Sequence, residues 1–460
     1  MDLVRESEGE LEARRDLSVS LQNLGWAAEM RGDWDAASAA YQEFLELTRE
    51  LVELQGTPQA RRDVSVALNK MGRVGETFGD WTKAEAAYQE SLEIRQGLEK
   101  ELGTPKARRD LSVSLDNIGR VAEARGDWDK AETAYQESLA LMQELEKLLG
   151  TPEARCDLSC SLASVGWVAE VRGDWDTAEA AYQESLRLAR ELDGLQGTIQ
   201  SYRNLSRSLD GAGRVAQARG DWDAAEAAYQ ESLALTRELE EVLGTPRARR
   251  NLSVSLDNVG RVALSRNDLA SADDAYQESL TIRRYLREEL GTPETYRDLS
   301  FSLNNVGRVA ETRGDWDAAE AAYQESLALA RELEEMQGTP RARRDLSVSL
   351  DNVGWALLTR GDKAAAESAF RESLGIRLEL EEMLETPEAL GDLSLALENM
   401  GQVSEAQDEW DTAQVAYQQS LQIRRMLEKM LGTPQAQQGV STSEEHLRRL
   451  SQKRADLGEL

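Results

Sequence analysis

Residues 105–151 read PKARRDLSVSLDNIGRVAEARGDWDKAETAYQESLALMQELEKLLGT, and this stretch decides the fold. Its first half carries apolar residues at helical spacing, at Leu111, Leu115, Ile118 and Ala122. Its second half carries a further apolar series, at Ala131, Tyr135, Leu139, Leu141 and Leu149. Gly126 suits the end of the first helix, and Asp127 can cap the next. The stretch therefore predicts two helices of about 21 residues each, joined by a turn.

The same pattern recurs along the whole chain with a period of 47 residues. One glycine keeps this step, at Gly25, Gly72, Gly119, Gly166, Gly213, Gly260, Gly307, Gly354 and Gly401. A Thr-Pro dipeptide keeps it too, except where Ile199 follows Thr198. The constant register leaves no room for an insertion or an interior linker. We expect nine repeats at 11–57, 58–104, 105–151, 152–198, 199–245, 246–292, 293–339, 340–386 and 387–433, with 1–10 extending the first helix and 434–460 forming a degenerate C-terminal cap helix.

A set of positions within each repeat matches a known motif. In the repeat quoted above these are Leu115, Ile118 and Gly119, then Gly126, Asp127 and Trp128, then Ala131, Tyr135 and Ser138. The set resembles the tetratricopeptide repeat, in an extended 47-residue form similar to bacterial tandem repeats, where the usual length is about 34 residues. The resemblance implies an all-α, right-handed superhelical solenoid of nine helix-turn-helix repeats, with the first helices lining a concave groove.

Composition narrows the range of partners and chemistry. Asp and Glu number 85 against 54 Lys and Arg, a formal net charge of −31, which argues against nucleic acid and anionic membranes as partners. The single histidine, His446, lies in the tail, where we expect a surface position. Cys156 and Cys160 are the two cysteines, too few for a disulfide framework or a metal site, and we expect Cys160 to replace a buried valine. We expect a cytoplasmic protein with no cofactor and no metal.

The tail departs from the repeat. Thr442 and Glu445 have the spacing of a capping box, which predicts that a helix begins there. Leu447, Leu450 and Leu457 follow as a narrow apolar stripe. We expect this segment to cap the solenoid, since the ends of a stacked array need a polar outer face.

Asparagine occurs two residues before the recurring glycine in six repeats, at Asn23, Asn117, Asn258, Asn305, Asn352 and Asn399. Asparagine is a poor residue inside a helix, so the recurrence needs a reason. One hypothesis is a ladder of amides on the concave face that binds the main chain of an extended peptide, as in superhelical members of the family that the sequence resembles. The alternative is that each amide bonds to the neighbouring repeat and maintains stacking.

The residue after the glycine is usually arginine, at Arg73, Arg120, Arg214, Arg261 and Arg308, or tryptophan, at Trp26, Trp167 and Trp355. The arginines either form a solvated charged face or bind carboxylates of a partner. Acids three residues before the glycine, at Asp116, Asp210, Asp257, Asp351 and Glu398, would then tune selectivity. The tryptophans are either exposed anchors for a partner or packing residues.

No catalytic motif occurs in the sequence. It lacks the phosphate-binding, zinc-protease and nucleophile-elbow patterns, and its Ser and Asp residues recur once per repeat, as structural positions do. We expect a non-enzymatic scaffold that binds an extended peptide or protein in the concave groove. Two alternatives stay open: a sensor or regulatory subunit of a bacterial signalling or defence complex, whose ATPase or protease effector is on another chain, and a self-assembling structural solenoid.

Overall fold

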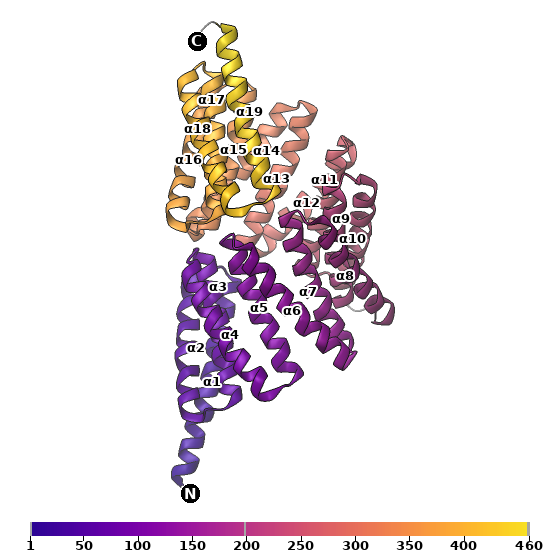
Figure 1. Cartoon of the computed structure of the whole chain (residues 1–460), viewed down its shortest axis with the longest axis vertical. Helices are drawn as coiled ribbons and strands as arrows, with labels where there is room; N and C mark the ends of the chain where they lie inside the picture. The colour runs from indigo at the N-terminus through magenta and orange to yellow at the C-terminus, as the bar shows by residue number, and fades with distance from the viewer. Residues whose placement is uncertain (1, 197–198, 458–460) are drawn as a thin grey trace. The chain divides into compact units, whose positions relative to one another are not determined.

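The computed structural model describes residues 2–196 and 199–457, which form nineteen helices and no strand (Figure 1). The first helices of the pairs are α1 (Asp2–Met30), α3 (Pro58–Phe78), α5 (Pro105–Ala124), α7 (Pro152–Arg172), α9 (Ile199–Ala218), α11 (Pro246–Ser265), α13 (Pro293–Arg313), α15 (Pro340–Thr359) and α17 (Pro387–Ala406). The second helices are α2 (Trp34–Gln55), α4 (Trp81–Leu102), α6 (Trp128–Leu149), α8 (Trp175–Gln196), α10 (Trp222–Leu243), α12 (Leu269–Leu290), α14 (Trp316–Gln337), α16 (Lys363–Leu384) and α18 (Trp410–Leu431). The last helix is α19 (Pro434–Leu457). The expected all-α array of nine helix pairs and a final helix is confirmed.

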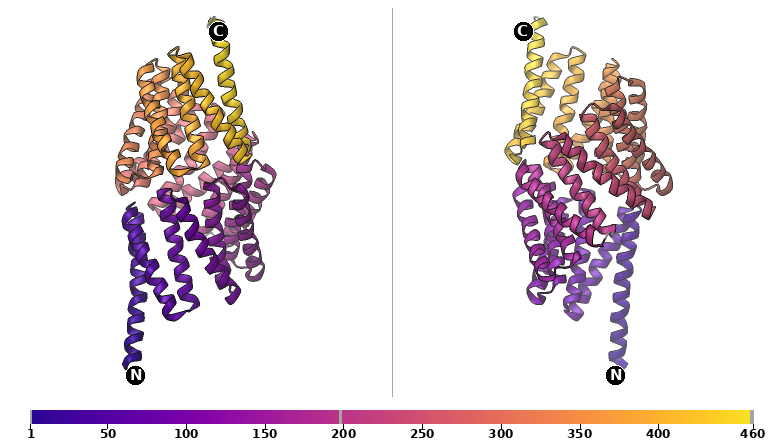
Figure 2. Two further views of the ribbon diagram at one scale, coloured as in Figure 1. Left: turned by 60° about the vertical axis from the view of Figure 1, so that its left-hand side comes forward. Right: turned by 90° about the vertical axis from the view of Figure 1, so that its right-hand side faces the viewer.

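The chain divides into two compact units, Met1–Ala154 and Arg155–Leu460. Within each unit, successive helices pack side by side, as the two views of Figure 2 show. First helices of consecutive pairs also touch, and α11, α13, α15 and α17 form such a row in the second unit. Each unit is therefore a stack in which helix pairs pack mainly on their neighbours, as expected of a solenoid. In the second unit Pro434, at the start of α19, also approaches Gly173 after α7.

The predicted helix ends are formed by the residues that the sequence indicates. Thr104 accepts a hydrogen bond from the backbone N of Ala107 at 3.2 Å, and Pro105 is the first residue of α5. Asp127 accepts one from the backbone N of Lys130 at 3.1 Å and so caps α6. These side chains satisfy N–H groups that have no partner inside the helix.

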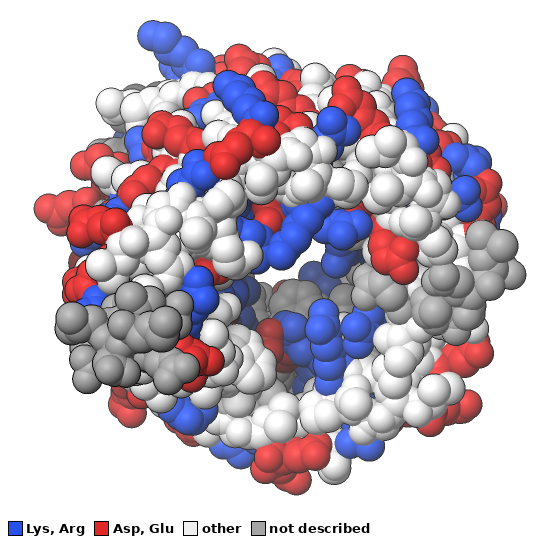
Figure 3. Space-filling view, turned by 90° about the horizontal axis from the view of Figure 1, so that it is seen from below, with Lys and Arg blue, Asp and Glu red and all other residues white. Residues whose placement is uncertain are grey.

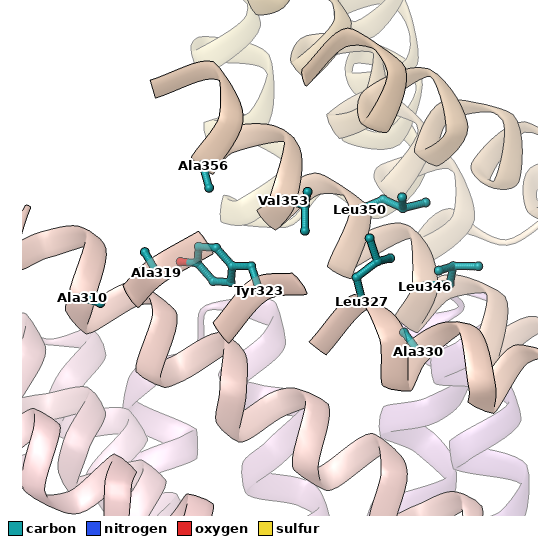
Figure 4. Close-up of a cluster of buried hydrophobic side chains, with 9 residues drawn as sticks. All are labelled: Ala310, Ala319, Tyr323, Leu327, Ala330, Leu346, Leu350, Val353 and Ala356. Atoms are coloured by element: carbon teal, nitrogen blue, oxygen red, sulfur yellow. The ribbon is translucent and has the colours of Figure 1, made fainter. Parts of the chain in front are cut away.

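The recurring glycine allows a tyrosine to pack between the two helices of a pair. A Cβ atom at Gly307 would lie 2.5 Å from the ring of Tyr323, closer than any real contact. Because Gly307 has no side chain, the Tyr323 ring can lie against α13. There it joins a buried cluster that includes Leu327 from α14 and Leu350 and Val353 from α15 (Figure 4). The core is thus a chain of small clusters, each within a helix pair or between adjacent pairs.

Helix α19 continues the register of the first helices and covers α18. Leu450 is 1% exposed and packs against Tyr417, and Leu447 lies beside it, whereas the side chain of Leu457 is outside the described residues. His446 is half-buried with its ring 5.1 Å from that of Tyr417, so the expected surface position is wrong. The predicted helix start at Thr442 is also wrong, because α19 begins at Pro434 and the Thr442 hydroxyl donates to the Gln438 carbonyl inside it.

Candidate functional site

One exposed face of the first helices carries a row of apolar residues that the sequence did not reveal. The residue six before the recurring glycine is exposed in four consecutive pairs, at Val254 (42%), Phe301 (53%), Val348 (40%) and Leu395 (46%). Val113 is equally exposed in the first unit, at 44%. The expectation that Cys160 replaces a buried valine is therefore wrong, although Cys160 itself is half-buried. The spacing could have revealed this exposure, since the position lies seven residues, or two helical turns, before the arginine that follows the glycine, and so on the same helix face.

The asparagines lie beside this row, but their amides are largely engaged within the protein. Asn305 and Asn399 are buried, Asn117, Asn258 and Asn352 are partly buried, and Asn23 is exposed. Asn258 donates from Nδ2 to Asp210 of the preceding pair at 3.3 Å and accepts from Arg261 at 3.1 Å. Asn117 and Asn305 likewise accept from the arginine three residues later, at 2.8 and 2.9 Å. Asn258 therefore makes a hydrogen bond to the neighbouring repeat, as expected if the asparagines maintain stacking.

Three of the five arginines are neutralised by the preceding helix pair. Arg73, Arg120 and Arg214 form ion pairs with the glutamate 44 residues earlier, which is Glu29, Glu76 and Glu170 respectively. The Arg120–Glu76 distance is 3.2 Å and the Arg214–Glu170 distance is 3.1 Å. These arginines serve the contact between adjacent pairs.

Arg261 and Arg308 lack this partner, because Gln217 and Leu264 occupy the corresponding positions. Arg261 donates to the hydroxyl of Tyr229 at 3.0 Å, and Arg308 donates to that of Tyr276 at 3.3 Å. Within residues 2–196 and 199–457, neither guanidinium forms an ion pair of 4.0 Å or less, although Arg261 interacts with Asp210 through charge and through Asn258. Both positive charges therefore stay without an ion pair on the face that carries the exposed apolar row.

The three tryptophans divide between the two alternatives. Trp26 and Trp167 are 54% and 41% exposed, and the guanidinium carbon of Arg214 lies 5.6 Å from the Trp167 ring centroid. Trp355 instead packs edge-to-face on Phe370, with 5.4 Å between ring centroids. Trp355 thus contributes to packing, while Trp26 and Trp167 present apolar surface.

The acids three residues before the glycine were expected to tune selectivity beside the arginines. They are instead buried or partly buried. Asp257 forms a buried ion pair with Arg283 of its own second helix at 2.5 Å. Asp351 and Glu398 pair in the same way with Arg377 and Arg424, at 2.6 and 2.7 Å. The signal that could have found these pairs is an arginine 26 residues after each acid.

Asp116 and Asp210 occupy the same position but have no such arginine, because Met142 and Thr236 stand 26 residues later. Burial raises the pKa of each carboxyl to about 6. These two groups therefore carry a cost of ionisation that no such arginine reduces, whereas at Asp257 burial also raises the pKa but the charge of Arg283 opposes that rise.

The remaining surface gives no sign of a metal or membrane site. Acidic and basic side chains are interspersed over the face that Figure 3 shows. Among the described residues, no group of three or more His, Cys, Asp or Glu side chains is placed to hold a metal ion. Nor is any described helix both long and apolar enough to span a bilayer.

The other cysteine, Cys156, accepts a hydrogen bond from Asn204 at 2.9 Å.

Comparison with known proteins identifies the repeat. A tetratricopeptide repeat profile matches residues 63–144 and 298–379, and two others match 208–243 and 20–47. The chain is a tetratricopeptide repeat protein. No curated protein sequence matches it. The family and the stacked helix pairs support a protein-interaction scaffold whose partner is a protein or peptide.

Several solved structures are similar to this chain. The apo form of RapI is 13% identical, with a TM-score of 0.53 over 90% of this chain and 99% of that one. A Rap protein complexed with Competence and Sporulation Factor is 14% identical, with a TM-score of 0.50 over 91% and 99%. BtubC from P. vanneervenii is 21% identical, with a TM-score of 0.46 over 55% and 92%. At these identities the two Rap structures show a shared fold and nothing more.

Proposed function

We propose that this protein is a non-enzymatic scaffold that binds an extended segment of a partner along the exposed face of α11, α13, α15 and α17, the face predicted to line the concave groove. The observation that carries the proposal is the row of four exposed apolar residues in register, Val254, Phe301, Val348 and Leu395, which we call the apolar row. Apolar side chains exposed at the same position of four successive helices, each of which touches the next, are a feature expected of an interaction site.

The charges beside the apolar row favour an acidic partner segment. Arg261 and Arg308 have no carboxylate within ion-pair distance among the described residues. A carboxylate of the partner could bind each of them as Glu170 binds Arg214. Acidic side chains of the partner would therefore bind these two arginines, while its apolar side chains cover the row. Asn258 and Asn352, which are partly buried, would border the bound segment and are candidate contacts to its main chain, whereas Asn305 and Asn399 are buried beneath it.

The same positions elsewhere in the chain are weaker candidates. Asn23, Asn117, Arg73, Arg120, Arg214, Trp26, Trp167 and Trp355 complete the predicted concave-face set. The three arginines among them are neutralised by glutamates, and Trp355 packs on Phe370. A Rap protein of this fold is known in complex with Competence and Sporulation Factor, which supports the idea that such a fold accommodates a partner.

Selection of peptides from a random phage-displayed library against the full chain tests this proposal. We expect the enriched peptides to combine acidic and apolar residues, and to bind Val348→Ser and Arg308→Gln less tightly, by roughly tenfold each. The matched controls are Val113→Ser, at the same repeat position and similar exposure, and Arg120→Gln, whose arginine is paired. Circular dichroism would confirm that all four variants fold.

Two outcomes would count against the proposal. Enriched peptides that are basic would exclude the arginines as contacts. Equal losses in each variant and its matched control would show that the apolar row of the second unit has no special role.

A second candidate function, self-assembly, is favoured by the first helix. Leu17 and Leu24 of α1 are 52% and 57% exposed, whereas the equivalent Leu111 and Ile118 are 8% and 5% exposed because a preceding helix pair covers them. If this face joins copies of the chain, sedimentation velocity should show a concentration-dependent dimer that Leu24→Lys abolishes. A monomer at all concentrations would remove this candidate.

A further inference from the structure

The first unit contains a cavity of about 100 Å³ among α3, α4 and α5. Arg62, Arg95 and Lys106 line it together with Asp110, and Leu98 and Leu102 supply apolar walls. Three cations and one carboxylate at a single small cavity are unusual in a chain whose net charge is −31. Comparison with equivalent positions in other helix pairs shows how this excess arises.

Arg62 lacks a carboxylate that two of its counterparts, Arg250 and Arg344, bind. A third counterpart, Arg297, resembles Arg62, because Arg341 stands at the equivalent position. Arg62 contacts Asp110 through Nε and, at 3.0 Å, through Nη2. Its counterpart Arg250 makes the same contacts to Asp298 and in addition binds Glu294 through Nη1 at 2.8 Å.

A second counterpart repeats this arrangement. Arg344 pairs with Asp392 and also binds Glu388 through Nη1 at 2.5 Å. The residue equivalent to Glu294 and Glu388 at the cavity is Lys106. One carboxylate is therefore replaced by a cation, and Nη1 of Arg62 has no carboxylate to bind.

Arg95 lacks a carboxylate as well, although it is only 4% exposed. Its Nε donates to the Ser65 hydroxyl at 3.0 Å and its Nη1 to the Asp110 carbonyl at 2.6 Å. Burial, aided by the charge of Arg62, lowers the pKa of Arg95 to about 10. Its cationic form is therefore destabilised where it lies.

The counterparts of Arg95 are compensated through the remaining nitrogen. Arg283, Arg377 and Arg424 each bind a buried carboxylate through Nη2, at 2.5, 2.6 and 2.7 Å. For Arg95 the residue at the carboxylate position is Asn69, whose Oδ1 is buried without a hydrogen-bond partner among the described residues. The neighbourhood of the cavity thus lacks two carboxylates that some other helix pairs possess, and it carries a lysine in place of one of them.

We propose that this cavity binds a carboxylate group supplied from outside the chain. The charge arises at positions where Glu294, Glu388 and Asp257 stand in other helix pairs, so the group that fits is a carboxylate on a short aliphatic chain. Arg62 Nη1 and Lys106 would bind the carboxylate, and Leu98 and Leu102 would contact its methylene groups. The ligand is either a small aliphatic dicarboxylic acid or an acidic side chain of a bound peptide. Asp63, the other carboxylate in this region, accepts a hydrogen bond from Gln59 at 2.7 Å and interacts with Lys106 through charge.

Isothermal titration calorimetry of the full chain tests the proposal with glutarate, with an acetylated and amidated Gly-Glu-Gly peptide, and with its Gly-Gln-Gly analogue. Lys106→Glu installs the residue found at Glu294 and Glu388, and should weaken binding at least roughly tenfold. Lys100→Glu makes the same charge change on an exposed residue of α4 outside the cavity, and should leave binding unchanged. Binding of glutarate alone would identify a free acid, and binding of the Glu peptide alone would identify a peptide side chain.

Three results would overturn this assignment. One is the absence of binding by both carboxylate probes. Another is equal weakening by Lys106→Glu and Lys100→Glu, which would indicate a general charge effect. The last is binding of inorganic phosphate as tight as that of glutarate, which would show that the cavity does not select carboxylates. None of these outcomes depends on the face of α11, α13, α15 and α17.

Discussion

Replacing Asp116 by asparagine should stabilise the first unit at neutral pH. Asp116 lies between α5 and α6, its Oδ1 is buried with no hydrogen-bond partner among the described residues, and Met142 stands where other pairs have arginine. Asparagine has nearly the same shape and carries no charge. The substitution therefore removes the cost of burying an ionised carboxylate while keeping the packing.

The magnitude follows from the pKa of the carboxyl group. Burial raises the pKa of Asp116 from 3.8 to about 6, so the folded state binds the proton more tightly than the unfolded state does. The group costs nothing below pH 3.8, and its cost grows as the pH rises through 6. The full shift corresponds to about 3 kcal/mol at pH 7.5, and to roughly half of that at pH 5. Relaxation of the surroundings makes a measured gain of about 1–2 kcal/mol at pH 7.5 the realistic expectation.

Amide hydrogen exchange of α5 and α6 is the suitable assay, since a solenoid need not unfold in one step and local opening free energies are what the substitution changes. Measurements at pH 7.5 and pH 5 should show that the gain from Asp116→Asn shrinks at the lower pH. Met142→Arg should also stabilise the chain, by supplying the cation that Arg283 supplies to Asp257. It should give no gain in the Asp116→Asn background. A gain from Asp116→Asn that is independent of pH, or a loss, would refute the reasoning.

Two other substitutions probe the same packing from different directions. Asp257→Asn should destabilise the second unit by about 3–5 kcal/mol, because it leaves Arg283 buried without its carboxylate, and thermal unfolding of the full chain measures this loss. Gly307→Ala should cost about 1–3 kcal/mol, because its Cβ would lie 2.5 Å from the Tyr323 ring. Gly375→Ala, in the interior of α16 with no atom within 4 Å of its Cβ, should stabilise by about 0.5–1 kcal/mol, and an equal loss in both glycine variants would contradict this account.

Much of the fold could be predicted from residues that act locally. Thr104, Pro105 and Asp127 determine helix ends through bonds to backbone groups within three residues, so a single repeat contains all the necessary information. The 47-residue period then extends this result to the whole chain. The tail was harder: Thr442 and Glu445 have the spacing of a helix start, but the helix had already begun at Pro434.

The candidate site was predicted less well, because its state depends on residues in other helices. Whether Arg261 forms an ion pair with a glutamate depends on residue 217, which lies 44 positions earlier in another first helix. Asp257 lies at the border between the polar and apolar sides of its helix, where the pattern of one helix does not indicate burial. Its burial becomes evident only when Arg283, on the second helix, is seen to face it. Distances of 26, 44 and 48 residues between partners are invisible to any reading of one helix at a time.

The ion pairs between successive first helices also bear on how such a chain can change in length. Arg250, Arg297 and Arg344 each pair with an aspartate 48 residues later, at Asp298, Asp345 and Asp392. Excision of one 47-residue period between α12 and α17 would set each remaining arginine opposite an equivalent aspartate. A chain that gained or lost whole periods in this region would therefore retain the arginine–aspartate pair at the new junction. Around α7 and α9 the same event would separate Cys156 from Asn204, so this stretch is the less interchangeable part of the chain.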